Sequence, residues 1–329
     1  MESESFETQR SAIAERLRRK KVIVIAGPTA SSKTELSVRI AKAIDGEVIS
    51  ADSMQVYRGM DIGTAKASPE ILAEVPHYQI NIRDICDPYN VAMYCEDSQI
   101  AYRKILVRGK VPIVAGGVGF YIHALMYGPP KGPSSVPEIR EHLEDELAKF
   151  GAELMYEKLR QLDPEYASTI TLQDRQKIVR GLEIMTITGD KVSSIPKPGP
   201  ADVPEDIDFR RWFIYYPKEV LYKRIEERCD AMIQNGLIEE VRLLLDQGLE
   251  LNSSAANAIG YRQCIEYLKS QQAASDFERF VHDFKRASRQ YAKRQFTWFR
   301  KEKDFRWIDL SQYSADHAAE LIMQDYEIG

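Results

Sequence analysis

The chain has 329 residues, of which 44% are hydrophobic and 29% are charged, and its formal net charge is −5. These values are typical of an ordinary soluble globular protein, and the length allows a full α/β core and one further module. No apolar stretch approaches the roughly 20 residues that a membrane helix needs. The sequence therefore excludes a helical membrane protein, and we expect no membrane partner.

The first twenty residues mix acidic and basic side chains and lack an apolar core. This pattern argues against a secretory signal and against a transit peptide. The four cysteines form no C-x-x-C pair, so neither a disulfide framework nor a zinc site is predicted. We expect a protein of the reducing cytoplasm, and nothing in the sequence requires more than a monomer.

Short apolar runs alternate with helical stretches over the first 130 residues. The expected strands are Val22–Ala26, Glu47–Ala51, Gln79–Ile82 and Val111–Ala115. The expected helices are Thr34–Ala43, Met93–Arg108 and Phe120–Met126. This alternation predicts a parallel sheet of the α/β class.

A run of small residues joins the first expected strand to the first expected helix. Its members are Gly27, Pro28, Thr29, Ala30, Ser31, Ser32, Lys33 and Thr34. Between a strand and a helix, backbone N–H groups and the helix dipole favour an anion, and the lysine reaches the outer phosphates. Thr34 stands where the loop hydroxyl usually meets Mg²⁺, so Mg²⁺ is the expected cofactor. The run matches G-x-x-x-x-G-K-[ST] except that Ser32 replaces the second glycine.

Two breaks rich in proline and glycine bound a helical region. Gly128–Pro133 is the first break and Ile195–Pro200 is the second. Between them, Val136 to about Thr188 reads as consecutive helices. We therefore predict an all-helical insertion domain at residues 131–205.

The chain after the second break is expected to complete the core. The run Arg211–Tyr216 reads as a strand that returns to the sheet. From Lys218 onward the chain reads as helical until a short terminal run around Trp307. The predicted architecture is a P-loop parallel-sheet core in two parts, residues 21–130 and 206–329, interrupted by the insertion domain.

The net charge hides a basic segment near the C-terminus. Residues 279–306 contain ten Lys or Arg side chains and three acidic ones. Arg286, Arg289, Lys293 and Arg300 recur at helical offsets, which places them in one stripe. Because local fields govern contact with a polyanion, the stripe predicts phosphate contact. A merely solvated helix face is the alternative.

The segment Ala51–Lys66 carries the most specific motif. It resembles the D-S-x-Q-x-Y-x-G-M-D-I-G-T-A-K block of the tRNA dimethylallyltransferases, also called tRNA isopentenyltransferases. Further matching blocks are Gly116-Gly117 with Phe120-Tyr121, Gly260–Gln263, and Arg289–Gln295 with Thr297-Trp298. The blocks agree with the family in order and spacing, and the resemblance spans nearly the whole chain.

The resemblance implies transfer of a dimethylallyl group from dimethylallyl diphosphate to N6 of adenosine 37, in tRNAs that read codons starting with U. The phosphate loop would then hold a diphosphate leaving group, which Lys33, Mg²⁺ and loop N–H groups neutralise. The family uses an arginine from the segment of Arg224 and Arg228 for the diphosphate, and Arg228 is favoured here. Asp52 is the candidate base for the N6 proton, with metal binding as the alternative.

The resemblance also assigns residues to the tRNA, whose loops proteins read by shape, stacking and phosphate contact. The expected contacts are Asp52, Ser53, Met54, Gln55, Gln176, Lys177, Arg180, Gly260, Tyr261, Arg262, Gln263, Arg286, Arg289 and Lys293. For the turn at 260–263 the alternative is a plain helix start. For residues 176–180 it is a solvated helix.

Three positions depart from the family pattern. Ser32 adds a side chain where the loop backbone should come closest to phosphate. Val118 stands where a Gly-Gly-Thr motif has its threonine near the diphosphate, and a lost hydroxyl bond there costs about 1–3 kcal/mol. Lys177 replaces an arginine and gives up bidentate phosphate geometry.

These departures leave other functions open. One is a tRNA-binding relative with reduced activity. Another is an adenylate isopentenyltransferase acting on free AMP, ADP or ATP, which should need neither the basic stripe nor the insertion. The last is a small-molecule kinase with a phosphate loop.

Overall fold

The computed structural model describes residues 19–328, and the N-terminal stretch considered above lies almost entirely outside this range. The chain forms two compact units. One combines the residues up to Gly128 with those from Val203 onward, and the other is Pro129–Asp202. The sequence analysis placed these two boundaries at residues 131 and 205.

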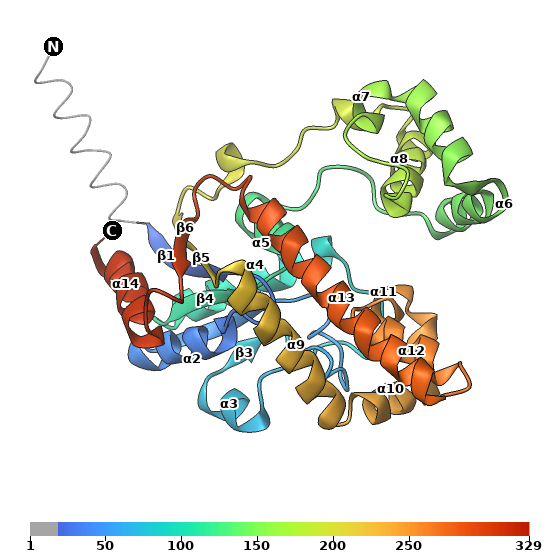
Figure 1. The fold of residues 1–329 in the computed structure, drawn as a ribbon. Helices are drawn as coiled ribbons and strands as arrows, with labels where there is room; N and C mark the ends of the chain where they lie inside the picture. Colours follow the sequence, from blue (N-terminus) through green and yellow to red (C-terminus); the bar gives the residue numbers. More distant parts are fainter. Residues whose placement is uncertain (1–18, 329) are drawn as a thin grey trace, which may run out of the picture. The chain divides into compact units, whose positions relative to one another are not determined.

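The first unit is built on a six-stranded sheet with the order β3-β2-β4-β1-β5-β6 (Figure 1). The strands are β1 (Lys20–Ala26), β2 (Gly46–Ala51), β3 (His77–Tyr78), β4 (Val111–Gly116), β5 (Ile207–Tyr215) and β6 (Arg306–Asp309). Every pairing is parallel. The predicted α/β class is confirmed, as are the strands expected at Val22, Glu47, Val111 and Arg211, and the short terminal run around Trp307 is the strand β6.

The strand predicted at Gln79–Ile82 is wrong. The third strand is only His77–Tyr78, and the next residues form bends. Gln79 and Asn81 adopt left-handed conformations, with φ of 58° and 56°, which a strand does not contain. The backbone N–H groups of Asn81 and Ile82 instead donate to carbonyls of residues 55 and 56. The segment is therefore a loop packed against the chain that follows β2.

The helices of this unit are α2 (Lys33–Ala43), α3 (Pro69–Glu74), α4 (Val91–Val107), α5 (Gly119–Tyr127), α9 (Lys218–Gln234), α10 (Leu237–Asp246), α11 (Ser253–Ala256), α12 (Tyr261–Leu268), α13 (Ala274–Phe299) and α14 (Ala315–Ile328), with the 3-10 turn η3 (Leu249–Leu251). Of these, α4 and α5 pack on one face of the sheet and α2 and α14 on the other. Val22 and Val24 of β1 pack with α4 and α5, whereas Ile23 and Ile25 pack with α2 and α14. Burial on both faces explains why the strands are continuous apolar runs. The sequence analysis did not predict α14.

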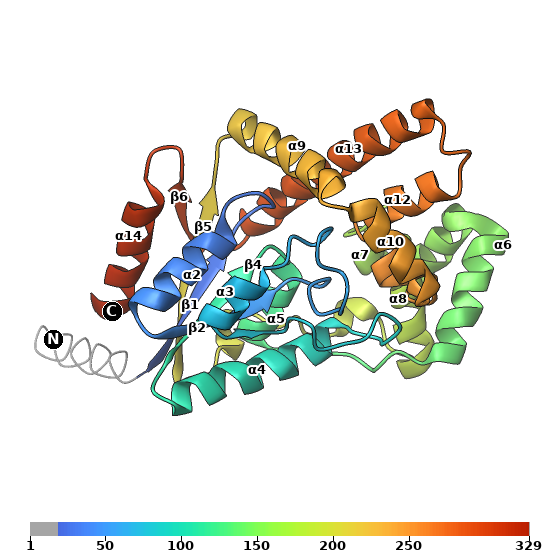
Figure 2. The ribbon, with the colours of Figure 1, turned by 90° about the horizontal axis from the view of Figure 1, so that it is seen from below.

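A separate apolar cluster joins four C-terminal helices to the segment after β2. Val56, Tyr57 and Met60 of this segment pack with Leu221 of α9 and Phe284 of α13, and with residues of α10 and α12. Figure 2 shows α9, α10, α12 and α13 grouped together. The motif between residues 51 and 66 is therefore held by helices from the other end of the chain. Across residues 19–328, no helix has both the length and the apolarity that crossing a bilayer requires.

The second unit is all-helical, as predicted. It contains α6 (Pro137–Leu162), α7 (Pro164–Ala167), α8 (Arg175–Thr188) and the 3-10 turns η1 (Val192–Ser194) and η2 (Pro200–Asp202). Its core forms between Leu143 and Leu159 of α6 and Ile178 of α8. The buried carboxylate of Glu183 accepts hydrogen bonds from the Ser135 hydroxyl and from the backbone at residue 136. This carboxylate ties the chain segment that enters the unit to α8.

Candidate active site

The loop between β1 and α2 contains two side-chain-bearing residues in the left-handed region. Ala30 has a φ of 63° and Ser32 a φ of 62°. For L-residues this conformation costs roughly 1–2 kcal/mol each. At Gly27 a side chain has no room, because a Cβ would collide with the carbonyl oxygen of Ile214. The loop is therefore strained, and its shape depends on contacts from outside.

Arg224 of α9 supplies one of these contacts. Its Nε donates to the carbonyl of Ala30 at 3.0 Å, and its Nη2 donates to the Ser32 hydroxyl at 2.8 Å. The guanidinium also lies over the Tyr216 ring, 4.5 Å from the centroid. The departure at Ser32 is thus compensated, since the added hydroxyl binds a cation beside the loop.

Lys33 and Arg228 bring two cations to the same loop. Lys33 Nζ donates to the carbonyl of Pro28 at 2.5 Å and to the Ser31 hydroxyl at 3.4 Å. Burial, with a smaller effect of Arg228, lowers the pKa of Lys33 to about 7. Burial also lowers the pKa of Arg228, which the carboxylate of Asp52 opposes. An anion bound here would favour the charged form of both side chains.

Asp52 follows the last residue of β2, at the edge of the sheet where parallel strands end. Its Oδ1 accepts hydrogen bonds from the backbone N–H groups of Met54 at 2.8 Å and Gln55 at 3.3 Å. Its Oδ2 accepts no hydrogen bond from residues 19–328. The turn therefore fixes the carboxylate through one oxygen and leaves the other to face a ligand.

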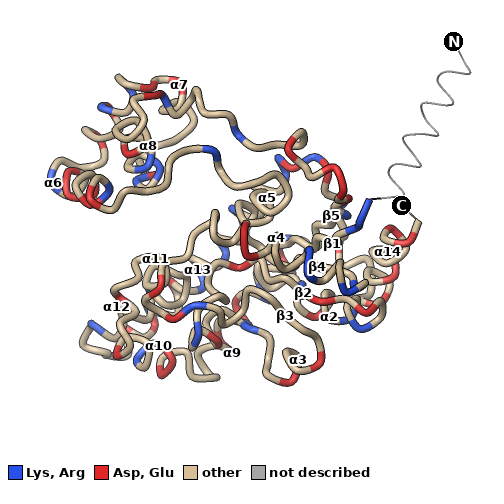
Figure 3. The backbone as a smooth tube through the Cα atoms, turned by 180° about the vertical axis from the view of Figure 1, so that it is seen from behind, with Lys and Arg blue, Asp and Glu red and all other residues tan. Residues whose placement is uncertain are grey.

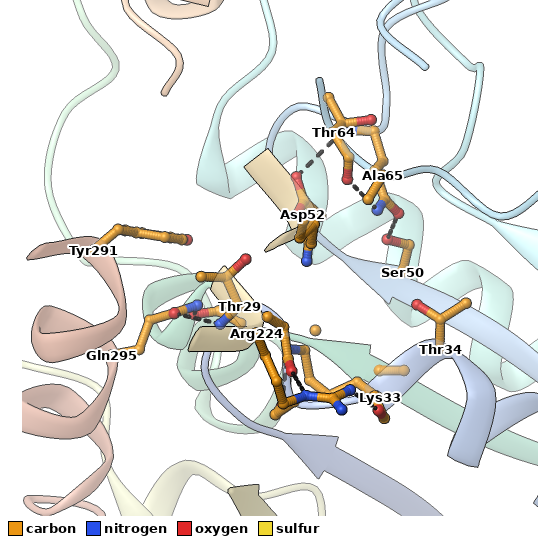
Figure 4. Close-up of a pocket in the computed structure, with 18 of the residues that line it drawn as sticks. Thr29, Lys33, Thr34, Ser50, Asp52, Thr64, Ala65, Arg224, Tyr291 and Gln295 are labelled. Atoms are coloured by element: carbon orange, nitrogen blue, oxygen red, sulfur yellow. Dashed lines mark hydrogen bonds between the residues drawn. The ribbon is translucent and has the colours of Figure 1, made fainter. Parts of the chain in front are cut away.

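The loop and Asp52 line one cavity of about 410 Å³ (Figure 4). Lys33, Arg224 and Arg228 give its wall three cations against the carboxylates of Asp52 and Glu227. A second cavity of about 300 Å³ adjoins the first. The two share the wall residues Thr29, Asp52, Thr64, Arg228 and Tyr291. The arrangement suits an anion in the first cavity and a second reactant beside it, with a carboxylate at the junction.

The segment after β2 is held by Glu240 of α10. This carboxylate accepts hydrogen bonds from three successive backbone N–H groups, those of Asp61, Ile62 and Gly63. It also accepts the hydroxyl of Tyr261 at 2.6 Å. Burial, followed by Glu240, raises the pKa of this tyrosine. Glu240 thereby fixes the loop that brings Thr64 to the cavity.

The four residues at the start of α12 divide between the interior and the surface. The side chains of Tyr261 and Gln263 are buried, and Gln263 accepts the backbone N–H of Gly260. Arg262 is exposed. Arg262 is therefore the exposed side chain of this turn, whereas the buried Tyr261 lines the second cavity and Gln263 holds the start of the helix.

The other expected tRNA residues also lie in different surroundings. Ser53 and Met54 line the second cavity, while the Gln55 side chain bonds inward to Ser50 and Thr64. Gln176 and Lys177 are exposed on α8, but the Arg180 guanidinium is bound to Glu183 and to the carbonyl of Pro133. On α13, Arg286 and Lys293 are exposed and Arg289 pairs with Glu226 at 2.5 Å. Figure 3 colours the Lys and Arg positions along these helices.

The structure does not bring Val118 to the wall of either cavity. Val118 is the N-cap residue of α5, and its backbone N–H donates to the carbonyl of Ala51 at 3.3 Å. The side chain packs against the apolar cluster on one face of the sheet. Gly116 and Gly117 line the first cavity, and the expected place of Val118 beside a diphosphate stays a prediction.

Sequence reasoning assigned no place in the wall to several of its residues, among them Tyr291 and Gln295 of α13. Gln295 is buried, and its amide bonds the backbone of Thr29 and of Gly117. It lies inside a sequence block already singled out, but its partners are backbone groups far away in the chain. Such partners leave no mark in the sequence.

The fold and this site define an α/β protein of the P-loop class, with a cationic loop beside a carboxylate. The family model of the IPP transferases matches residues 55–302, and that of the isopentenyl transferases matches residues 20–89. The chain belongs to the IPP transferase family.

Relatives agree along nearly the whole chain. This chain is 54% identical to the tRNA dimethylallyltransferase of Protochlamydia amoebophila, over 94% of this chain and 90% of the relative. It is 45% identical to the tRNA dimethylallyltransferase of Chlamydia pneumoniae, over 94% of this chain and 91% of that relative. The full-length tRNA isopentenylpyrophosphate transferase of Bacillus halodurans has a TM-score of 0.68 at 35% identity, covering 94% and 96%. A eukaryotic dimethylallyltransferase acting on tRNA has a TM-score of 0.74 at 28% identity, covering 93% and 79%.

The bond between Ser32 and Arg224 predicts energetic coupling. Ser32→Ala keeps the strained backbone but removes the hydroxyl, so it should lower the free energy of unfolding by about 1 kcal/mol. The same change should have almost no effect in an Arg224→Met background. Denaturant unfolding of the two single variants and the double variant measures this cycle. Additive effects would contradict the bond.

The lowered pKa of Lys33 predicts proton uptake when a diphosphate binds. Below about pH 7, Lys33 of the unliganded protein is already charged, so its protonation adds no pH dependence to diphosphate affinity. Above that pH, affinity for inorganic pyrophosphate should fall by up to about tenfold per pH unit relative to Lys33→Arg. Calorimetry of both proteins across this range measures the difference. Parallel pH profiles of the two would refute the prediction.

Proposed function

We propose that this chain transfers a dimethylallyl group from dimethylallyl diphosphate to N6 of adenosine 37 in tRNA. The observation that carries the proposal is the position of Asp52, in the walls of both cavities and next to the cationic loop. One cavity suits the diphosphate and the other suits the acceptor base. Membership of the IPP transferase family supports the same reaction.

The diphosphate is bound by the loop as a leaving group. Lys33 and Arg228 supply positive charge, and the backbone N–H groups at the start of α2 add the helix dipole. When the bond between C1 of the prenyl group and the bridging oxygen breaks, its electron pair stays on the diphosphate. These cations stabilise the charge that develops there.

The amine is activated by Asp52. As N6 forms its bond to C1, it loses a proton, which Asp52 Oδ2 accepts. The hydrogen bonds from the backbone of residues 54 and 55 hold Oδ1, and they thereby fix the direction in which Oδ2 points. The target adenine must first leave its stack, at a cost of a few kcal/mol, and the second cavity offers Tyr291 and Asn257 to receive it.

Mg²⁺ fits this site through few protein ligands. Within residues 19–328, no three His, Cys, Asp or Glu side chains gather as a metal cluster. Thr34 lies on the cavity wall at the start of α2 and offers a hydroxyl. Mg²⁺ typically keeps several waters and binds substrate phosphates, so one hydroxyl and the diphosphate suffice. The ion would neutralise charge on the leaving group.

Exposed cationic and polar side chains on each unit offer contacts to the tRNA. Arg286 and Lys293 lie on α13, and Gln176 and Lys177 lie on α8 of the insertion unit. We also propose that the enzyme works as a monomer in the cytoplasm. The proposed reaction is tested by incubating the protein with labelled dimethylallyl diphosphate, Mg²⁺ and a tRNA with adenosines at positions 36 to 38. Mass spectrometry should show the prenylated nucleoside; label only on free AMP, or none, would refute it.

Asp52→Asn should lower kcat by about 10²–10⁴-fold, because an amide cannot accept the proton. The turn should persist, since the amide oxygen still accepts the bonds from residues 54 and 55. Affinity for tRNA should therefore stay the same. Single-turnover kinetics and tRNA binding measure both effects, with Asp246→Asn on the exposed face of α10 as the matched control. An active Asp52→Asn variant would remove Asp52 from the role of base.

Arg286→Gln and Lys293→Gln should each weaken tRNA binding and flatten its salt dependence, by about one unit of log–log slope per lost phosphate contact. The matched control is Lys104→Gln, which removes an exposed cation from α4. Titrations of an anticodon stem-loop at several salt concentrations measure the slopes. Slopes equal to that of the control would mean that the α13 cations are only solvated.

A further inference from the structure

The side chain of Gln295 connects α13 to two loops of the active site. Its Oε1 accepts the backbone N–H of Thr29 at 2.8 Å, and its Nε2 donates to the carbonyl of Gly117 at 2.9 Å (Figure 4). A backbone N–H can only donate and a carbonyl can only accept, so the two partners fix the orientation of the amide. The side chain is almost completely buried.

The two partners follow neighbouring strands. Thr29 lies in the loop after β1, and Gly117 directly follows β4. These strands pair in parallel, with Ala26 opposite Gly116. A side chain from a third element thus spans two loops at the edge of the sheet where the cavity lies.

Gly117 provides the space for this contact. A Cβ at this position would collide with Nε2 of Gln295. The glycine and the glutamine are therefore a matched pair, since one leaves room for the amide of the other.

The phosphate loop needs such support because its conformation is strained at Ala30 and Ser32. Arg224 holds the loop from one side, at the carbonyl of Ala30 and the hydroxyl of Ser32. Gln295 of α13 holds the loop at a second point, the backbone N–H of Thr29. These contacts therefore hold the loop at Thr29, at Ala30 and at Ser32.

We propose that Gln295 is a positioning residue for the diphosphate, an inference that rests on the proposed function. It fixes the loop after β1 relative to the loop after β4, so that the backbone N–H groups converge before the ligand arrives. A preformed cradle binds more tightly, because little ordering is left for the binding step. Since α13 also carries the proposed tRNA-binding cations, the shape of the cradle depends on the same helix.

Gln295→Met removes both hydrogen bonds while keeping a side chain of similar length. Its dissociation constant for inorganic pyrophosphate should rise about tenfold. Gln290→Met, an exposed position on the same helix, should leave this constant unchanged. Calorimetry well below the melting temperature of each variant measures the affinity. The KM for the prenyl donor should rise, whereas the affinity for the tRNA stem-loop should not change. A general structural defect would instead weaken the binding of both substrates.

A cooperatively folded Gln295→Met variant with wild-type pyrophosphate affinity would overturn the inference. Should this variant fail to fold, Gly117→Ala decides, because its Cβ displaces the same amide from the other side. Weakened pyrophosphate binding there supports the inference, and unchanged binding overturns it. Wild-type protein that binds no pyrophosphate would instead refute the proposed function, and the inference with it.

Discussion

The site depends on a strained loop that is held from two sides. Ala30 and Ser32 adopt left-handed conformations that side-chain-bearing residues rarely take. Arg224 and Gln295 hold this loop from α9 and α13, two helices that lie far from it in the sequence. The strain therefore persists only in the folded protein, where the helices are in place. A phosphate cradle of this kind is a tertiary feature rather than a local one.

The same logic extends to the segment after β2. Asp52 is the general base of the proposed reaction, whereas most other residues of the motif around it have structural contacts. Glu240 holds three backbone N–H groups of this segment, and the buried Lys66 ammonium donates to the carbonyl of Tyr57 and to Asn81. A motif that is highly specific in sequence therefore divides into one reactive carboxylate and a framework that positions it.

Much of the fold was predictable because its signals are local. Apolar runs marked the strands, and the small residues before Lys33 marked the loop between strand and helix. The error at Gln79–Ile82 arose because two isoleucines among polar residues resemble a strand, while the left-handed backbone there is set by contacts to another segment. Gln295 and Glu240 were missed because they bind backbone groups, which any residue type provides.

The central claim is that the strained loop binds the diphosphate of a prenyl donor as a leaving group. A crystal structure of the protein with pyrophosphate and Mg²⁺ tests it most directly. The account predicts pyrophosphate oxygens within hydrogen-bond distance of Lys33 Nζ and of the backbone N–H groups at the start of α2, with Arg228 beside them. Pyrophosphate bound elsewhere, with Lys33 still donating to the carbonyl of Pro28, would contradict it.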